Sequence, residues 1–432
     1  MKENIIFDFN RIPEGTKFNT RLMVNLTADT NTKEVGKPLN VAVVLDRSGS
    51  MNGEPLHYVK MATKVLANQL NPDDRFSLTM YDSSIDTLIK PTLMQDIRSL
   101  DAVIDTIDAG GMTFLSGGYE KGCQDAKEYV SKDTITRVML LTDGLANEGI
   151  TNPDQLAQLA SNQKKNGITT STIGVGEGYD EFLLGRMAEY GGGSTYFIED
   201  PDNAPSVFKE ELGYLKSMAA SQVSLTFKPK EQGLTFEQLN TYKKNTDESY
   251  SLGDFFSGQS KSILFEMALP PMTLGENTYI GDVEITYRST TGDEITDESI
   301  SMSITIDVVS EKIFQNEVPN KDVTLEAAFL LVARAKAKSI TFADNGKYDD
   351  AAEILDNYAS LISNLNLDNE QLNNEVADLR SRAQNMRQFK EDFYTVREKK
   401  RMFYESDKMA KSEMISYQKM KGRRKDKSDF DY

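Results

Sequence analysis

The sequence predicts an α/β protein: a doubly wound parallel sheet, inserted in an antiparallel β-sandwich and followed by a C-terminal helical region. Between residues 39 and 220, buried strand patterns alternate with helical patterns. Segments with the two-residue alternation of β-strands lie on both sides of that block. From residue 324 onward, apolar residues recur at the helical period. These three observations define the fold class.

The two flanking β segments, residues 1–38 and 221–312, each hold too few strands for a closed fold. The first has strand patterns at residues 5–9 and 21–28, separated by a turn. The second has four alternating stretches joined by polar turns. We therefore expect the two segments to form one discontinuous sandwich, with residues 39–220 inserted as a separate domain.

We expect residues 321–421 to form a helical hairpin or bundle. Two shorter helical patterns come first, and a long charged helix runs from about residue 369 towards residue 421. The last segment, residues 422–432, is basic although the whole chain is acidic. A flexible, solvated tail is the simpler interpretation, and a docking tail for an acidic partner is the alternative.

Composition excludes several classes of function. The formal net charge of −18 argues against nucleic acid or anionic lipid as the main partner. Cys123 is the only cysteine and His57 the only histidine, so disulfides within the chain, cysteine-rich or histidine-based metal sites and Ser-His-Asp triads are disfavoured. We expect Cys123 to be a core residue and His57 an ordinary residue of its helix.

The amino terminus lacks the basic segment and apolar core of a secretory signal. No apolar run approaches the roughly 20 residues that a membrane span needs. We therefore expect a cytoplasmic protein with no membrane span.

Oxygen-bearing side chains follow two buried strands of the predicted sheet. Asp46, Ser48 and Ser50 come directly after one apolar, β-branched strand, and Asp143 follows another. Thr113 lies in a glycine-flanked loop between them. The carboxyl ends of parallel strands share one edge of the sheet, so these five side chains can converge there. Two carboxylates and three hydroxyls suit Mg²⁺, with Mn²⁺ as a substitute.

This set resembles the metal-ion-dependent adhesion site of the von Willebrand factor type A domain family. The motif is Asp46-x-Ser48-x-Ser50, Thr113 and Asp143, and the resemblance covers about residues 39–220. The flanking β segments resemble bacterial members of the calcium-activated chloride channel and inter-α-inhibitor-like type. The resemblance implies a bound Mg²⁺, or Mn²⁺ or Ca²⁺ in its place, whose open position takes an Asp or Glu from a partner protein.

The residues next to this motif form the expected rim around the ion. We expect the rim to comprise Arg47, Met51, Asn52, Phe114, Leu115, Leu145, Asn147 and Glu148.

The function we predict is a metal-dependent interaction module or scaffold, and no enzyme. A regulatory subunit of a partner enzyme complex, such as an ATPase, a chelatase or a kinase and phosphatase system, is the alternative. A Mg²⁺-dependent phosphoryl-transfer enzyme is a weaker alternative, because aspartate-nucleophile hydrolases need a second carboxylate two residues after the first, and position 48 is serine. An extracellular adhesin or a channel-associated role requires a signal or membrane segment that we do not find in this sequence.

Overall fold

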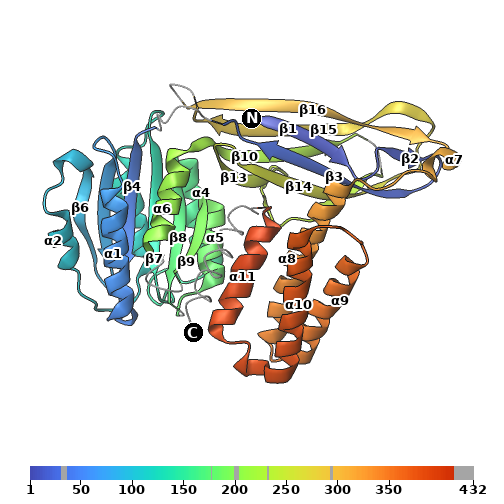
Figure 1. Ribbon diagram of the computed structural model, residues 1–432. Coiled ribbons are helices and arrows are strands. Elements are labelled where there is room, and N and C mark those ends of the chain that lie inside the picture. Colours follow the sequence, from blue (N-terminus) through green and yellow to red (C-terminus); the bar gives the residue numbers. More distant parts are fainter. Residues whose placement is uncertain (31–36, 177, 199–203, 231–232, 292–294, 413–432) are drawn as a thin grey trace.

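The computed structural model describes residues 1–30, 37–176, 178–198, 204–230, 233–291 and 295–412. Figure 1 shows three parts: an α/β part, a β-sandwich beside it, and a group of helices that lies against both. No helix in the described part of the chain is long and apolar enough to cross a membrane.

The central sheet of the α/β part has six strands in the order β6-β5-β4-β7-β8-β9. Its strands are β4 (Leu39–Asp46), β5 (Arg75–Tyr81), β6 (Ile85–Leu93), β7 (Ile135–Thr142), β8 (Ile168–Val175) and β9 (Gly192–Ile198). All neighbouring pairs are parallel except β5 and β6. Strand β6 was not expected from the sequence; it contains Pro91 and exposed charged residues, as edge strands often do.

Helices cover both faces of this sheet, as the doubly wound fold class predicts. They are α1 (Glu54–Asn68), α2 (Leu100–Asp105), α3 (Leu115–Lys127), α4 (Pro153–Lys165), α5 (Glu181–Gly191) and α6 (Ala204–Lys216). One apolar core joins α1, α2 and α6 to the sheet, and a second joins α3, α4 and α5 to its other face. Cys123 is buried in the second core, as expected.

The sandwich combines strands from before and after the α/β part. One sheet has the order β1-β3-β14-β11 and the other β12-β13-β10-β15-β16-β2. The strands are β1 (Lys2–Phe7), β2 (Arg11–Pro13), β3 (Phe18–Thr27), β10 (Met218–Pro229), β11 (Thr235–Gln238), β12 (Lys243–Lys244), β13 (Tyr250–Phe256), β14 (Ser260–Leu269), β15 (Gly275–Ser289) and β16 (Thr296–Val309). Strand β3 pairs with β14, and β2 pairs with β16, so the two chain segments share one apolar core.

The helical region contains α7 (Glu311–Phe314), α8 (Lys321–Ala343), α9 (Tyr348–Ser363), α10 (Glu370–Phe389) and α11 (Val396–Ala410). The single long helix expected from about residue 369 is wrong. Helix α10 ends at Phe389 because Lys390 adopts a positive φ of 46°. Helix α11 starts anew where the Thr395 side chain accepts a hydrogen bond from the backbone N–H of Glu398. Residues 413–421 and the basic tail lie outside the described residues.

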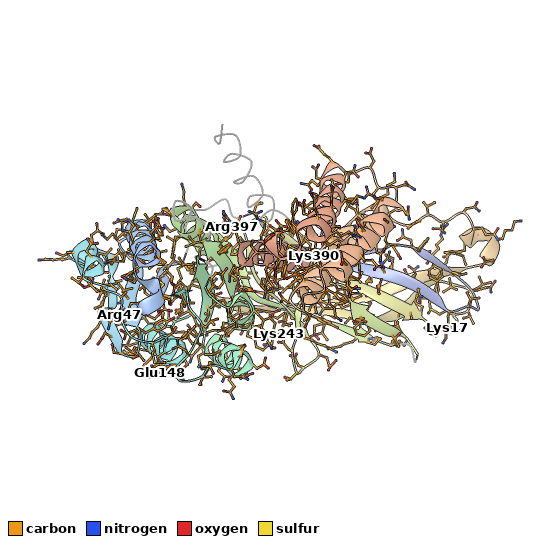
Figure 2. All side chains as sticks on the ribbon, turned by 90° about the horizontal axis from the view of Figure 1, so that it is seen from below. Lys17, Arg47, Glu148, Lys243, Lys390 and Arg397 are labelled. Carbon is orange, nitrogen blue, oxygen red and sulfur yellow. The ribbon has the colours of Figure 1, made fainter. Side chains whose placement is uncertain are left out.

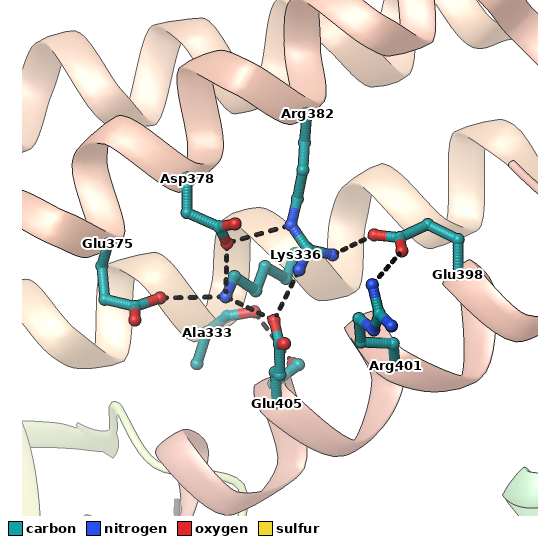
Figure 3. Close-up of polar contacts among 9 residues, drawn as sticks. Ala333, Lys336, Glu375, Asp378, Arg382, Glu398, Arg401 and Glu405 are labelled. Atoms are coloured by element: carbon teal, nitrogen blue, oxygen red, sulfur yellow. Dashed lines mark hydrogen bonds and ion pairs between the residues drawn. The ribbon is translucent and has the colours of Figure 1, made fainter. Parts of the chain in front are cut away.

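A buried ion network holds α8, α10 and α11 together, as Figure 3 shows. Lys336 lies 3.0 Å from Glu375, 3.1 Å from Asp378 and 2.8 Å from Glu405. Arg382 bridges Asp378 and Glu405 at 2.9 and 3.0 Å. Burial lowers the pKa of Lys336, but the three carboxylates outweigh it and hold the pKa above its ordinary value. This network fixes how the charged helix α11 packs.

Candidate metal site

The five predicted ligands come together at the carboxyl edge of the central sheet. Strands β4 and β7 are parallel neighbours, so the residues at their ends, Asp46 and Asp143, are adjacent. The short 3-10 helix η1 (Gly49–Met51) turns the chain back directly after β4. The loop that contains Thr113 is fixed to the β4 loop by hydrogen bonds from Gly49 N to Gly111 O and from Gly110 N to Arg47 O.

Hydrogen-bond distances show how close four of the five residues lie to one another. Ser50 Oγ donates a hydrogen bond to Asp143 Oδ1 at 2.8 Å, and it lies 3.2 Å from Ser48 Oγ. The backbone N–H of Ser48 donates to Asp46 Oδ1 at 2.8 Å.

Gly144 shows that Thr113 belongs to the same cluster. A Cβ atom on Gly144 would lie 3.3 Å from both Ser50 Oγ and Thr113 Oγ1, and 3.9 Å from Asp46 Oδ2. Glycine at this position therefore leaves the space between the ligand oxygens open.

The cluster is mostly buried but reaches solvent on one side. Asp46, Ser48, Thr113 and Asp143 are buried, whereas Ser50 is exposed. Burial raises the pKa of Asp46 despite the hydrogen bonds it accepts. Burial also raises the pKa of Asp143 to about 6; the hydrogen bond from Ser50 opposes this, and the charge of Asp46 adds to it. The two carboxylates therefore repel each other.

The donor set fits a hard divalent cation. Among the described residues, no ion pair involves Asp46 or Asp143. The cation nearest in sequence, Arg47, points elsewhere, with Nη2 3.2 Å from Asp82 Oδ2 and 3.0 Å from Ser84 Oγ. The described residues contain no group of three or more His, Cys, Asp or Glu arranged to hold a metal. Two carboxylates supplemented by hydroxyl oxygens form the kind of shell that Mg²⁺ accepts.

Two residues that were not expected at the site from the sequence, Thr142 and Tyr81, interact with Asp46. Thr142 Oγ1 donates to Asp46 Oδ2 at 2.5 Å and accepts a hydrogen bond from Gly144 N at 3.1 Å. The Tyr81 side chain is fully buried, and burial together with the charge of Asp46 raises its pKa well above the ordinary value. The Thr-Asp-Gly sequence signals Thr142, but nothing in the sequence places Tyr81 here.

The expected rim is partly wrong. Met51 and Leu115 are completely buried, because they pack into the apolar cores on opposite faces of the sheet. Asn52, Leu145 and Asn147 are exposed, and Arg47, Phe114 and Glu148 are partly buried. Met112, which was not expected at the rim, is 52% exposed. Figure 2 shows Arg47 and Glu148 at the end of the molecule opposite Lys17.

The fold and the arrangement of these oxygen ligands define a protein class. The family model of the von Willebrand factor type A domain matches residues 40–210, so the chain contains a von Willebrand factor type A domain. Domains of this family bind a divalent metal at a motif of this kind and bind protein partners through it.

Particular relatives extend the similarity beyond that domain. The chain is 26% identical over 332 residues to the Synechocystis sp. protein sll0103, covering 74% of this chain and 76% of that protein. It is 28% identical over 260 residues to Escherichia coli YfbK, covering 58% of this chain but 45% of YfbK. The solved von Willebrand factor type A structure from Catenulispora acidiphila matches with a TM-score of 0.66 at 17% identity, covering 88% and 89% of the two chains, which shows a shared fold.

Proposed function

We propose that this chain is a metal-dependent protein-binding module. Asp46, Ser48, Ser50, Thr113 and Asp143 hold Mg²⁺, and a partner protein supplies an Asp or Glu to the open position of the ion. One observation carries the proposal: two buried, mutually repelling carboxylates and three hydroxyls meet at one solvent-facing point. A divalent cation removes that repulsion.

The charge balance explains why an outside carboxylate would bind. The five side chains supply two formal negative charges at most, and the hydroxyls are neutral oxygen donors. The dication therefore keeps enough positive charge to attract a third carboxylate. The partner's carboxylate would enter on the side of Ser50, which is the exposed side of the cluster.

The proposed role is binding without catalysis. His57 is exposed on α1, and its ring lies against Tyr58. Cys123 is buried, and burial raises the pKa of its thiol to about 12, so at neutral pH it is a poor nucleophile. Histidine and cysteine are the residue types that most often supply a base or a nucleophile at neutral pH. Neither His57 nor Cys123 therefore supports an enzymatic proposal.

The test is partner capture from lysate of the source cells, with Mg²⁺ or with a chelator, followed by mass spectrometry. We expect Asp46→Ala and Thr113→Ala to lose the partners that the wild type captures with Mg²⁺. Asp96→Ala, which removes an exposed carboxylate of the same domain, is the control and should capture normally. Equal capture of the same partners with chelator and by Asp46→Ala would contradict the proposal.

Assays for phosphatase and ATPase activity with Mg²⁺ test the enzymatic alternative. We expect no turnover above background. Robust turnover that disappears in Asp143→Ala would replace the binding proposal with a catalytic one.

A further inference from the structure

Helix α11 of the C-terminal region contacts the α/β part at one particular loop. Lys400 on α11 is buried, and its Nζ donates hydrogen bonds to Tyr179 O at 2.6 Å and to Glu181 Oε2 at 3.0 Å. The same ammonium lies 3.6 Å from the centre of the Tyr179 ring. Tyr179 and Glu181 lie between the end of β8 and the first turn of α5. Figure 1 shows α11 between the other helices and the α/β part.

A second side chain of α11 joins the same contact. Tyr404, one helical turn after Lys400, accepts a hydrogen bond from Tyr179 Oη at 3.2 Å. Its ring stacks on Phe197 of β9, with centroids 5.8 Å apart. Residues four apart lie on one face of a helix, so Lys400 and Tyr404 form one continuous contact surface.

The contacted loop also lies against the candidate metal site. A Cβ atom on Gly178 would lie 2.7 Å from the backbone oxygen of Asp143, so the loop backbone packs directly on that residue. A Cβ atom on Gly174 would lie 2.3 Å from the Tyr179 ring, which covers the end of β8. The packing leaves little space, so a displacement of Tyr179 would be transmitted to Asp143.

The wider helical region is attached to the same point. Lys399 lies 3.3 Å from Glu181 and 3.1 Å from Asp344, the residue directly after α8. Lys399 and Lys400 therefore connect the first turn of α5 both to α11 and to the end of α8.

We propose that Lys400 and Tyr179 are positioning residues that link the docking of α11 to metal affinity. Docked α11 holds Gly178 against Asp143 and so favours the geometry in which Asp143 serves as a ligand. A partner that displaces α11 would weaken metal binding, and bound metal would in turn stabilise the docked helix, because coupling between two sites is reciprocal. This inference rests on the proposed metal site.

The experiment measures Mn²⁺ affinity by titration calorimetry and amide hydrogen exchange of α11 in the full chain. We expect Lys400→Met to weaken Mn²⁺ binding about tenfold, within the usual range of allosteric coupling. Arg397→Met, which changes an exposed residue of the same helix, should bind as the wild type does. In the wild type, Mn²⁺ should slow exchange in α11, and Asp46→Ala should abolish this effect.

Tyr404→Phe provides a milder variant in case Lys400→Met does not fold. It removes only the hydroxyl that contacts Tyr179. We expect this variant to weaken Mn²⁺ binding by about twofold to threefold, because α11 then docks less firmly on Tyr179. A purely structural role of Lys400 would lower stability towards urea without changing Mn²⁺ affinity.

Two results separate the inference from the proposed function. If the wild type and Lys400→Met bind Mn²⁺ equally, and Mn²⁺ does not change hydrogen exchange in α11, the proposed coupling is wrong but the proposed metal site is not contradicted. If the wild type binds no Mn²⁺, both are wrong.

Discussion

At the scale of single residues, the proposed ligands Asp143 and Asp46 are expected to destabilise the metal-free protein. Both are buried, and the charge of Asp46 raises the cost of ionising Asp143. We predict that Asp143→Asn stabilises the metal-free protein by about 1 kcal/mol, because it removes this repulsion and keeps the oxygen that Ser50 contacts.

Urea unfolding of both proteins in chelator and in Mg²⁺ measures this effect. With Mg²⁺ the order should reverse, since only the wild type gains stability from the ion. An Asp143→Asn protein that is less stable than the wild type in chelator would contradict the predicted repulsion.

The apolar rim suggests what surrounds the partner's carboxylate. Met112 and Leu145 are 52% and 57% exposed on loops that flank the site. The loop of Met112 is held by a hydrogen bond from its backbone N–H to Ser83 Oγ at 2.9 Å. We predict that Met112→Ser and Leu145→Ser each weaken partner binding about fivefold, equivalent to about 1 kcal/mol of lost apolar contact.

The matched control for the rim is Met61→Ser, an exposed methionine on α1. Binding curves with a captured partner measure the affinity for the partner, and Mn²⁺ titrations measure the affinity for the metal. Metal affinity should stay unchanged in all three variants. A loss of partner binding in Met61→Ser equal to that in Met112→Ser would show that the rim has no special role.

The convergence of the five proposed ligands could be predicted from the sequence, because strand ends in a parallel sheet have a fixed relation in space. Asp46 and Asp143 follow recognisable buried strands, and Thr113 lies in a recognisable glycine loop. The position of Tyr81 next to Asp46 could not be predicted, because it depends on which way one aromatic side chain of a buried strand points. Met51 was misplaced for the same reason.

At the scale of elements, the helical region shows where sequence patterns fail. The charged sequence after residue 369 has the helical period throughout, yet the chain turns at Lys390. The charged residues of that segment include Arg382 and Glu405, which pair with each other in the interior, and Glu405 also pairs with Lys336 of α8. A pattern of charges along one helix does not show which charges find partners on another.

We predict that Lys336→Met lowers the free energy of unfolding by about 3–5 kcal/mol, because it removes one of the two cations, Lys336 and Arg382, that balance the buried carboxylates. Lys338→Met, two residues along α8 and exposed, should change it by no more than about 0.5 kcal/mol. Chemical denaturation of both variants tests this. Equal stability of the two variants would mean that the network in Figure 3 contributes little to stability.

At the scale of the whole molecule, the insertion was predictable because each β segment lacked partners for its strands. The pairing of β3 with β14 gives strands of both segments a hydrogen-bonded neighbour. The exact ends of the inserted domain, near residues 39 and 220, stay a prediction. The docking of α11 on the α/β part was not predictable, because Lys400 lies in a run of charged residues that resembles a solvated surface.

The junction between α11 and α5 gives the stability a specific pH dependence. Burial raises the pKa of Glu181, but hydrogen bonds from the backbone and Lys400 and the charge of Lys399 outweigh it, so the pKa lies below its ordinary value. Ionised Glu181 therefore stabilises the folded protein above about pH 4.5, and this contribution disappears as pH falls through the lowered folded-state pKa.

We predict that Glu181→Gln costs about 1 kcal/mol at pH 7 and progressively less below about pH 4. Urea unfolding at several pH values measures the difference from the wild type. Glu353→Gln, at an exposed position on α9, should show no such trend. A cost for Glu181→Gln that stays constant down to pH 3.5 would contradict the assignment.

The most direct test of the metal site is Mn²⁺ binding to the full chain, measured by titration calorimetry with Mg²⁺ as competitor. The net charge of −18 attracts cations weakly everywhere, so the comparison with Asp46→Ala and Thr113→Ala decides the result. We predict a single tight site that Mg²⁺ displaces, lost in Asp46→Ala and weakened at least tenfold in Thr113→Ala. Unchanged tight binding in Asp46→Ala, or no tight site in the wild type, would contradict this account.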